Sequence, residues 1–287
     1  MDAELERYVE EASDPRLISG IYNYCHRRCG HCPFTDRCLT FRHMRNDETA
    51  RPEGGAIEEV AHNLERTVDL LKAWCAREGV DLEKLQEEAA ADGRKPETAR
   101  LGHGVDADPL HVLAFAYTTA AFDLVSGLER LEPFHQWSPV VREALDTIGW
   151  YSGLVSTKVG RALFGLAERD PDDESEDPVQ NDWNGSAKVA RMAIAESQRA
   201  WDTLLQVGQA PPDAPLRQTR TLLDRIDAAI ATRFPRAMEF VRPGFDEPEV
   251  AAGALSTLAC FEPRPQRSER GVVAWLQRVA GTWRRRS

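Results

Sequence analysis

The stretch PLHVLAFAYTTAAFDLVSGL, residues 109–128, decides the fold that the sequence predicts. At about 100° per residue, its apolar side chains cover both sides of a helix. One side carries Leu110, Leu113, Ala114, Tyr117, Ala121, Leu124 and Leu128, and the other carries Val112, Phe115 and Phe122. A helix that is apolar nearly all round lies buried in a bundle or in a membrane. Because His111 and Asp123 interrupt it, we expect a bundle with this stretch as its central helix.

Helical spacing of apolar residues recurs on both sides of this stretch. A helix is expected after Gly55, with an apolar stripe made of Ile57, Leu64, Val68, Leu71 and Cys75. Further helices are expected from Ser138 to about Glu168, over residues 186–207, and from Pro215 to about Phe234, where Pro235 should end or kink the last one. No alternating strand pattern of any length occurs. The predicted fold is therefore all-α, with about five main helices.

Composition and charge exclude several classes of protein. The chain has 287 residues, with 36 Lys and Arg against 47 Asp and Glu, which gives a net charge of −11. An acidic total disfavours non-specific binding to nucleic acid, since phosphate attraction needs concentrated positive charge. No apolar run reaches the roughly 20 residues of a transmembrane helix, and the acidic start MDAELERYVEEASD does not resemble a secretory signal. We expect a soluble protein of the cytoplasm.

Four of the six cysteines lie within fourteen residues, in the string YNYCHRRCGHCPFTDRC. Cys25, Cys29, Cys32 and Cys38 have the spacing C-x3-C-x2-C-x5-C. In a reducing compartment, clustered thiols are typical of metal ligands rather than of disulfides. Four thiolates suit tetrahedral zinc or an iron–sulfur cluster, so we take a zinc ion as the first interpretation and a cluster as the alternative. The other two cysteines, Cys75 and Cys260, are expected to be buried core thiols.

Two resemblances bear on this segment. The first three thiols resemble the C-x3-C-x2-C cluster motif of radical S-adenosylmethionine enzymes, which implies a β/α barrel that this sequence does not predict. The segment, together with IGWYSGLVSTKVGRAL and NDWNGSAKVARMAIAESQRAW, also resembles a group of uncharacterised bacterial helical proteins. That resemblance implies no activity, but it groups several residues with the thiols. These residues are Trp150, Tyr151, Lys158, Arg161, Asp182, Gly185, Ser186, Lys188 and Trp201.

Three polar features of the helices are candidate sites. Asp123 is the only carboxylate in the nearly apolar stretch, and we expect it to be a buried charge that needs a partner. Lys158, Arg161 and Lys188 could bind a small anion or phosphate. The alternative is salt bridging to the carboxylates Glu143, Asp146 and Asp182. Trp150 lies on the polar stripe of its helix, so it suggests that the thiol segment or another subunit covers this side.

The last residues form a separate part of the chain. From Arg264 onward there are seven arginines and one glutamate, and apolar residues from Val272 to Trp283 recur at helical spacing. This basic amphipathic tail could contact an anionic membrane surface through residues 268–286, or it could dock on the acidic protein. The sequence thus divides into a cysteine-rich metal-binding segment (1–50), a helical bundle (51–262) and the tail (263–287).

The predicted function is metal binding through the four-cysteine site, with structural zinc that supports a binding or interaction role. The alternatives are an iron–sulfur redox protein and an adaptor that docks through the basic tail. The partner would be an unidentified protein or a small anionic ligand. The chain contains no GxxxxGK[ST], GxGxxG, GxSxG or HExxH motif, so the sequence supplies no catalytic residues.

Overall fold

The computed structural model describes residues 2–49, 56–82, 104–131, 136–169, 177–207 and 213–247, together with residues 84 and 87. These residues form helices, short 3-10 turns and irregular segments, and they contain no strand. The predicted all-α fold is confirmed. By its contacts the chain divides after Glu247 into two units. The predicted basic tail and Cys260 belong to the second unit, which lies outside the described residues.

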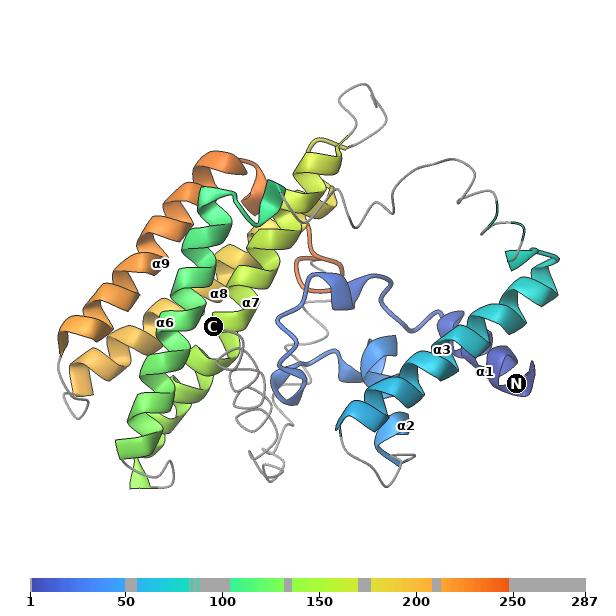
Figure 1. The fold of residues 1–287 in the computed structure, drawn as a ribbon, viewed down its shortest axis with the longest axis horizontal. Helices are drawn as coiled ribbons and strands as arrows, with labels where there is room; N and C mark the ends of the chain where they lie inside the picture. Colours follow the sequence, from blue (N-terminus) through green and yellow to red (C-terminus); the bar gives the residue numbers. More distant parts are fainter. Residues whose placement is uncertain are drawn as a thin grey trace. The chain divides into compact units, whose positions relative to one another are not determined.

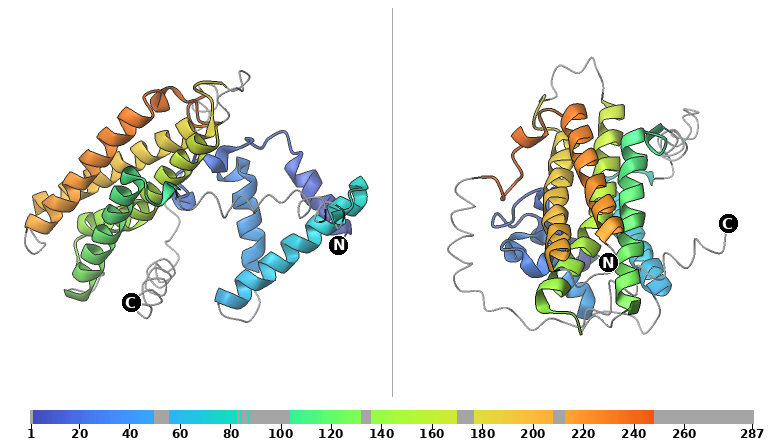
Figure 2. Two further views of the ribbon diagram at one scale, coloured as in Figure 1. Left: turned by 45° about the horizontal axis from the view of Figure 1, so that its top comes forward. Right: turned by 90° about the vertical axis from the view of Figure 1, so that its left-hand side faces the viewer.

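Four long helices form the main bundle. They are α6 (Pro109–Leu131), α7 (Pro139–Glu168), α8 (Asp182–Val207) and α9 (Asp213–Arg233). Consecutive helices run in opposite directions, as the colours of Figure 1 show. α6 packs on α7, α7 on α8, α8 on α9, and α9 again on α6, so the four helices enclose one core (Figure 2). This arrangement is an up-and-down four-helix bundle.

The helix ends follow from local sequence. The Asp108 carboxylate accepts a hydrogen bond of 2.8 Å from the Leu110 amide at the start of α6, and the Ser138 hydroxyl accepts one of 3.4 Å from Val141 at the start of α7. Side chains of this kind satisfy amide groups that have no partner within the helix. At the end of the last bundle helix, α9 stops at Arg233, two residues before the predicted breaker Pro235.

The core of the bundle contains large side chains with almost no exposure, including Tyr117, Ile148, Trp201, Leu223 and Ile226. Tyr117 and Trp201 are both 0% exposed, and the indole Nε1 of Trp201 donates a hydrogen bond of 3.2 Å to the Tyr117 hydroxyl. Burial of a polar N–H group is stable only when it has such a partner. This hydrogen bond therefore joins α6 and α8 across the centre of the bundle.

The expectation that residues 109–128 form the central helix is wrong. α6 packs mainly on α7 and α9, and its outer face is uncovered: Val112 is 53% exposed and Phe115 is 58% exposed. Asp123 lies on the exposed part of the same helix, so the predicted buried charge is also wrong. A carboxylate in that position stays hydrated and needs no ion-pair partner. By length and composition alone, Pro109–Arg130 is the one described helix that could cross a membrane.

The helices whose bounds the structure describes before the bundle are α1 (Asp2–Ala12), α2 (Leu39–Thr49) and α3 (Ala56–Glu78). The predicted burial of Cys75 is confirmed, since Cys75 is 3% exposed. The rest of its expected stripe is not buried, because Leu64, Val68 and Leu71 are 62%, 47% and 49% exposed. α3 contacts α1 but none of the four bundle helices packs along it, so helical periodicity there does not mark a core face.

We predict that Tyr117→Phe destabilises the bundle by about 1–3 kcal/mol, because it leaves the buried Trp201 N–H without an acceptor. Urea denaturation followed by circular dichroism measures this difference. Phe115→Tyr, which adds a hydroxyl to an exposed ring, serves as the control and should change the free energy of unfolding by less than about 0.5 kcal/mol. Equal stability of Tyr117→Phe and the wild type would contradict the prediction.

Candidate metal centre

The four clustered cysteines lie in a segment of short turns between α1 and α2, residues 18–38, which we call the cysteine segment. Its turns are η1 (Ile21–Asn23), η2 (Cys29–His31) and η3 (Thr35–Arg37). The Ile18 amide donates a hydrogen bond of 3.0 Å to the Arg37 carbonyl, which brings the two ends of the segment together. Backbone hydrogen bonds across η2 and η3 place Cys29, Cys32 and Cys38 at the ends of tight turns.

All four thiols border one small hollow. The space between them holds about 20 Å³, which is room for one or two water-sized spheres. Each thiol is half-buried. Burial and the nearby Cys25, Cys32 and Cys38 raise the pKa of Cys29 to about 11, so negative charge is unfavourable here unless a cation offsets it.

The four thiols border the same hollow but do not converge on one point. Among the residues that the structure describes, no three histidine, cysteine, aspartate or glutamate side chains are placed as ligands of a single ion. The four thiols surround the hollow instead, so their assignment as metal ligands stays a prediction. The remaining lining comes mainly from aromatic and basic residues, namely Ile21, Tyr22, His26, Arg27, Arg28, Thr35, Phe41 and Phe245.

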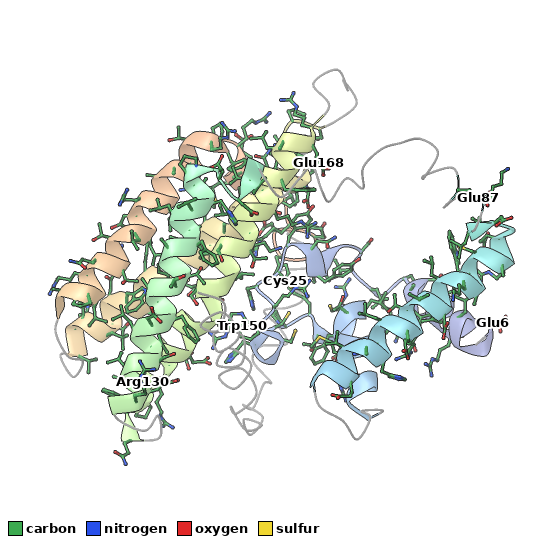
Figure 3. The ribbon with its side chains drawn as sticks, in the orientation of Figure 1. Glu6, Cys25, Glu87, Arg130, Trp150 and Glu168 are labelled. Carbon is green, nitrogen blue, oxygen red and sulfur yellow. The ribbon has the colours of Figure 1, made fainter. Side chains whose placement is uncertain are left out.

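The first half of the cysteine segment is held against α7 by hydrogen bonds to its main chain. The indole Nε1 of Trp150 donates to the His26 carbonyl at 2.8 Å, and Lys158 Nζ donates to the Asn23 carbonyl at 2.5 Å. These two acceptors lie on either side of Cys25 in the sequence. Trp150 and Cys25 are labelled in Figure 3, where the segment meets the helix. The sequence interpretation that the thiol segment covers Trp150 agrees with this contact.

Arg28 adds a side-chain contact with the same helix. Its guanidinium donates to the Asp146 carboxylate at 2.5 Å and to the Thr147 hydroxyl at 3.3 Å, and it lies 3.9 Å from Glu143. The side chain of Arg28 is 13% exposed, whereas that of Asp146 is 55% exposed, so the guanidinium is buried but its carboxylate partner stays in contact with water. Asp146 and Trp150 of α7 therefore hold the part of the cysteine segment that lies between Cys25 and Cys29.

Tyr24 anchors the segment to α8. Burial and the neighbouring Asp182 carboxylate raise the pKa of Tyr24 to about 12, and its hydroxyl donates to Asp182 at 3.0 Å. Its ring lies over Gly185, where an added Cβ would come within 2.4 Å of the ring carbons. Phe240 packs on the other part of the Tyr24 ring, with ring centroids 4.6 Å apart. Only glycine fits at position 185 with this ring in place.

The segment that follows α9, residues 234–247, covers the cysteine segment from another side. Phe245 borders the hollow, and its ring packs edge-on against Phe34 with centroids 5.0 Å apart. Gly244 has a φ of +76°, and a Cβ there would lie 2.8 Å from Ile18. Sequence analysis missed this cover. The available signals were Phe240, Phe245 and the Pro243-Gly244 pair, which follow the helix breaker Pro235.

The cover is attached to α8 by charged groups. Lys188 Nζ donates to the Phe240 carbonyl at 2.6 Å and to the Asp246 carboxylate at 2.7 Å. Arg242 also donates to Asp246, at 2.9 Å, and its guanidinium lies 4.9 Å from the centre of the Phe245 ring. Although burial acts in the opposite direction, the hydrogen bonds from Arg242 and Lys188 hold the pKa of Asp246 below its usual range.

The three predicted anion-binding residues each contact different acceptors within the protein. Lys158 contacts Asn23, Arg161 forms a bidentate pair with Asp182 at 2.7 and 2.8 Å, and Lys188 contacts Asp246. For Arg161 and Lys188 the alternative of salt bridging describes the structure, although Lys188 uses Asp246 rather than a carboxylate named from sequence. The three cations therefore bind separate acceptors within the protein and do not converge on a site for one external anion.

Comparison of the chain with family models, with curated proteins and with solved structures gives no match. The class of site must therefore come from the residues themselves. Four soft thiols around a space for one small ion fit zinc or another thiophilic metal, whereas hard cations prefer oxygen ligands. Lys158 and Arg28 supply positive charge beside the thiols, as a centre that carries net negative charge requires. The residues present thus fit a four-cysteine metal centre.

We predict that Gly185→Ala destabilises the protein by about 1–3 kcal/mol and loosens the cysteine segment, because the new methyl group overlaps Tyr24 and Phe240. Gly153→Ala is the matched control, since it also adds a methyl group within a bundle helix but meets no atom within 4 Å. This control should be neutral or stabilising by up to about 1 kcal/mol. Thermal unfolding of both variants measures the difference, and equal melting temperatures would refute the predicted overlap.

Proposed function

We propose that the protein binds a metal ion through Cys25, Cys29, Cys32 and Cys38, and that this ion fixes the cysteine segment to the helical bundle. The observation that carries the proposal is that all four thiols border one hollow in a segment which α7, α8 and residues 240–247 hold from several sides. Zinc is the first candidate, because the hollow has room for one small ion and a closed site of four cysteines is typical of structural zinc. The resulting surface would serve a binding or interaction role.

An iron–sulfur cluster is the second candidate, and a separate observation favours it. All four thiols fall within fourteen residues, which is closer to the way ferredoxins gather their ligands than to the two separated thiol pairs of many zinc sites. In addition, Phe34 and Phe245 form an aromatic cover over one side, and exclusion of water is one of the factors that set the potential of such a cluster. In that case the protein would transfer electrons.

Metal analysis distinguishes the two candidates. We expect the full chain, purified without oxygen, to be colourless and to contain about one zinc per chain. Cys32→Ser should lose most of this metal, whereas Cys75→Ala, which changes the buried thiol of α3, should retain it. A brown protein with iron and acid-labile sulfide would establish the second candidate instead. Absence of zinc, iron and other thiophilic metals from the wild-type protein would refute both.

Removal of the metal should release the cysteine segment without unfolding the bundle, because the core of α6–α9 contains none of the four cysteines. We therefore expect a strong chelator to make the bonds after Arg27, Arg28 and Arg37 sensitive to trypsin. Helical circular dichroism should fall by less than about one fifth, since most described helical residues lie in α3 and in the bundle. Equal rates of cleavage in the metal-bound and metal-free protein would contradict a fixing role.

A further inference from the structure

Lys158 is a buried cation without a matching anion. Its side chain belongs to α7, and the residue is only 5% exposed. Among the described residues, no carboxylate lies within ion-pair distance of its ammonium group, whose hydrogen bond goes to the neutral carbonyl of Asn23. Enclosure of a charge in a protein costs several kcal/mol unless an opposite charge lies nearby. The burial of this particular lysine therefore needs an explanation.

The Asp182 carboxylate does not provide one. It interacts electrostatically with Lys158, but its two oxygens accept hydrogen bonds from Arg161 and Tyr24. Two other cations, Arg161 and Arg27, make the surroundings more positive. Burial, followed by the charge of Arg161, lowers the pKa of Lys158 to about 8, which shows that the charged form is disfavoured by the polypeptide alone.

The thiols are the remaining source of negative charge. Asn23, whose carbonyl binds Lys158, precedes Cys25 by two residues, and a thiolate at Cys25 would favour the charged form of Lys158. A divalent ion with four thiolate ligands carries a net charge of about −2, because ligands bind in the deprotonated form. Such a centre would place the missing anion beside Lys158.

We propose that Lys158 is the counter-charge of the four-cysteine centre and also positions the turn that carries Cys25. This inference rests on the proposed metal site and adds the residue that tunes it. Lys158 forms no hydrogen bond to a predicted ligand. It acts through its charge and through its hydrogen bond to the Asn23 carbonyl. Groups outside the ligand shell of a metal commonly orient the ligands and set the metal affinity in this way. The centre and the lysine thus stabilise each other inside the protein.

Zinc competition tests the inference on the full chain, with Zn²⁺ and a chromogenic chelator as the probe. We expect Lys158→Met to weaken zinc binding about 10–100-fold, the usual effect of a change beyond the ligand shell. Lys158→Arg, which retains the charge, should restore most of the affinity. Arg161→Met is the matched control, because it removes a nearby cation that already has Asp182 as its partner, and it should change the affinity less than about threefold.

The metal-free protein supplies a second readout that separates the counter-charge from a simple structural contact. Without metal, Lys158→Met removes an uncompensated buried charge, so its melting temperature should equal or exceed that of the wild type. With zinc it should lie below the wild type. Wild-type zinc affinity in Lys158→Met, equal destabilisation with and without metal, or an equal effect of Arg161→Met would overturn the inference. Failure of the wild type to bind zinc or another thiophilic metal would instead refute the metal site itself.

Discussion

Close packing of α7 against α8 positions most of the contacts that hold the cysteine segment to the bundle. Both helices bury small side chains, such as Ser156, Ala190 and Ser197. Their backbones approach closely where a Cβ added at Gly165 of α7 would lie 3.6 Å from Trp183 of α8. The outer surface of the pair then presents Trp150 and Lys158 from one helix and Gly185 from the other. A shift of either helix along its neighbour would separate the donors from the carbonyl groups that they bind. The precision of the candidate metal centre therefore depends on a packing interface that contains no metal ligand.

The contacts of the segment divide into two types with different physical roles. Hydrogen bonds from Trp150 and Lys158 reach backbone carbonyls, so they fix the path of the main chain around Cys25 whatever its side chains are. Ring packing of Tyr24 and Phe245 instead covers part of the segment and reduces the contact of the half-buried thiols with water. Exclusion of water strengthens electrostatic interactions, which makes the buried charge of Lys158 more consequential than a charge on the surface.

Sequence patterns predicted the parts of this structure that depend on local chemistry. Pro139 and Pro235 mark where helices begin and end, and the cysteine spacing indicates one shared site, because these effects act within a few residues. Trp150 on a polar stripe correctly indicated a covered face. Patterns failed where burial depends on distant partners: the apolar stripe of α3 is exposed, and Asp123 is hydrated, because neither pattern specifies which neighbour packs there. The acceptors at Asn23 and His26 could not be found at all, since every residue has a carbonyl group.

The order in which the polypeptide is synthesised gives the cover at Phe245 a further consequence. Cys25 leaves the ribosome first, the anchoring helix α7 follows more than a hundred residues later, and Phe245 follows Cys25 by 220 residues. At roughly 5–20 residues per second, the thiols wait about ten to forty seconds for their complete surroundings. During that interval they are open to oxidation and to the wrong metals, and no finished pocket selects among them. Assembly of the candidate centre would therefore depend on what the nascent chain meets before α9 and the segment after it have folded.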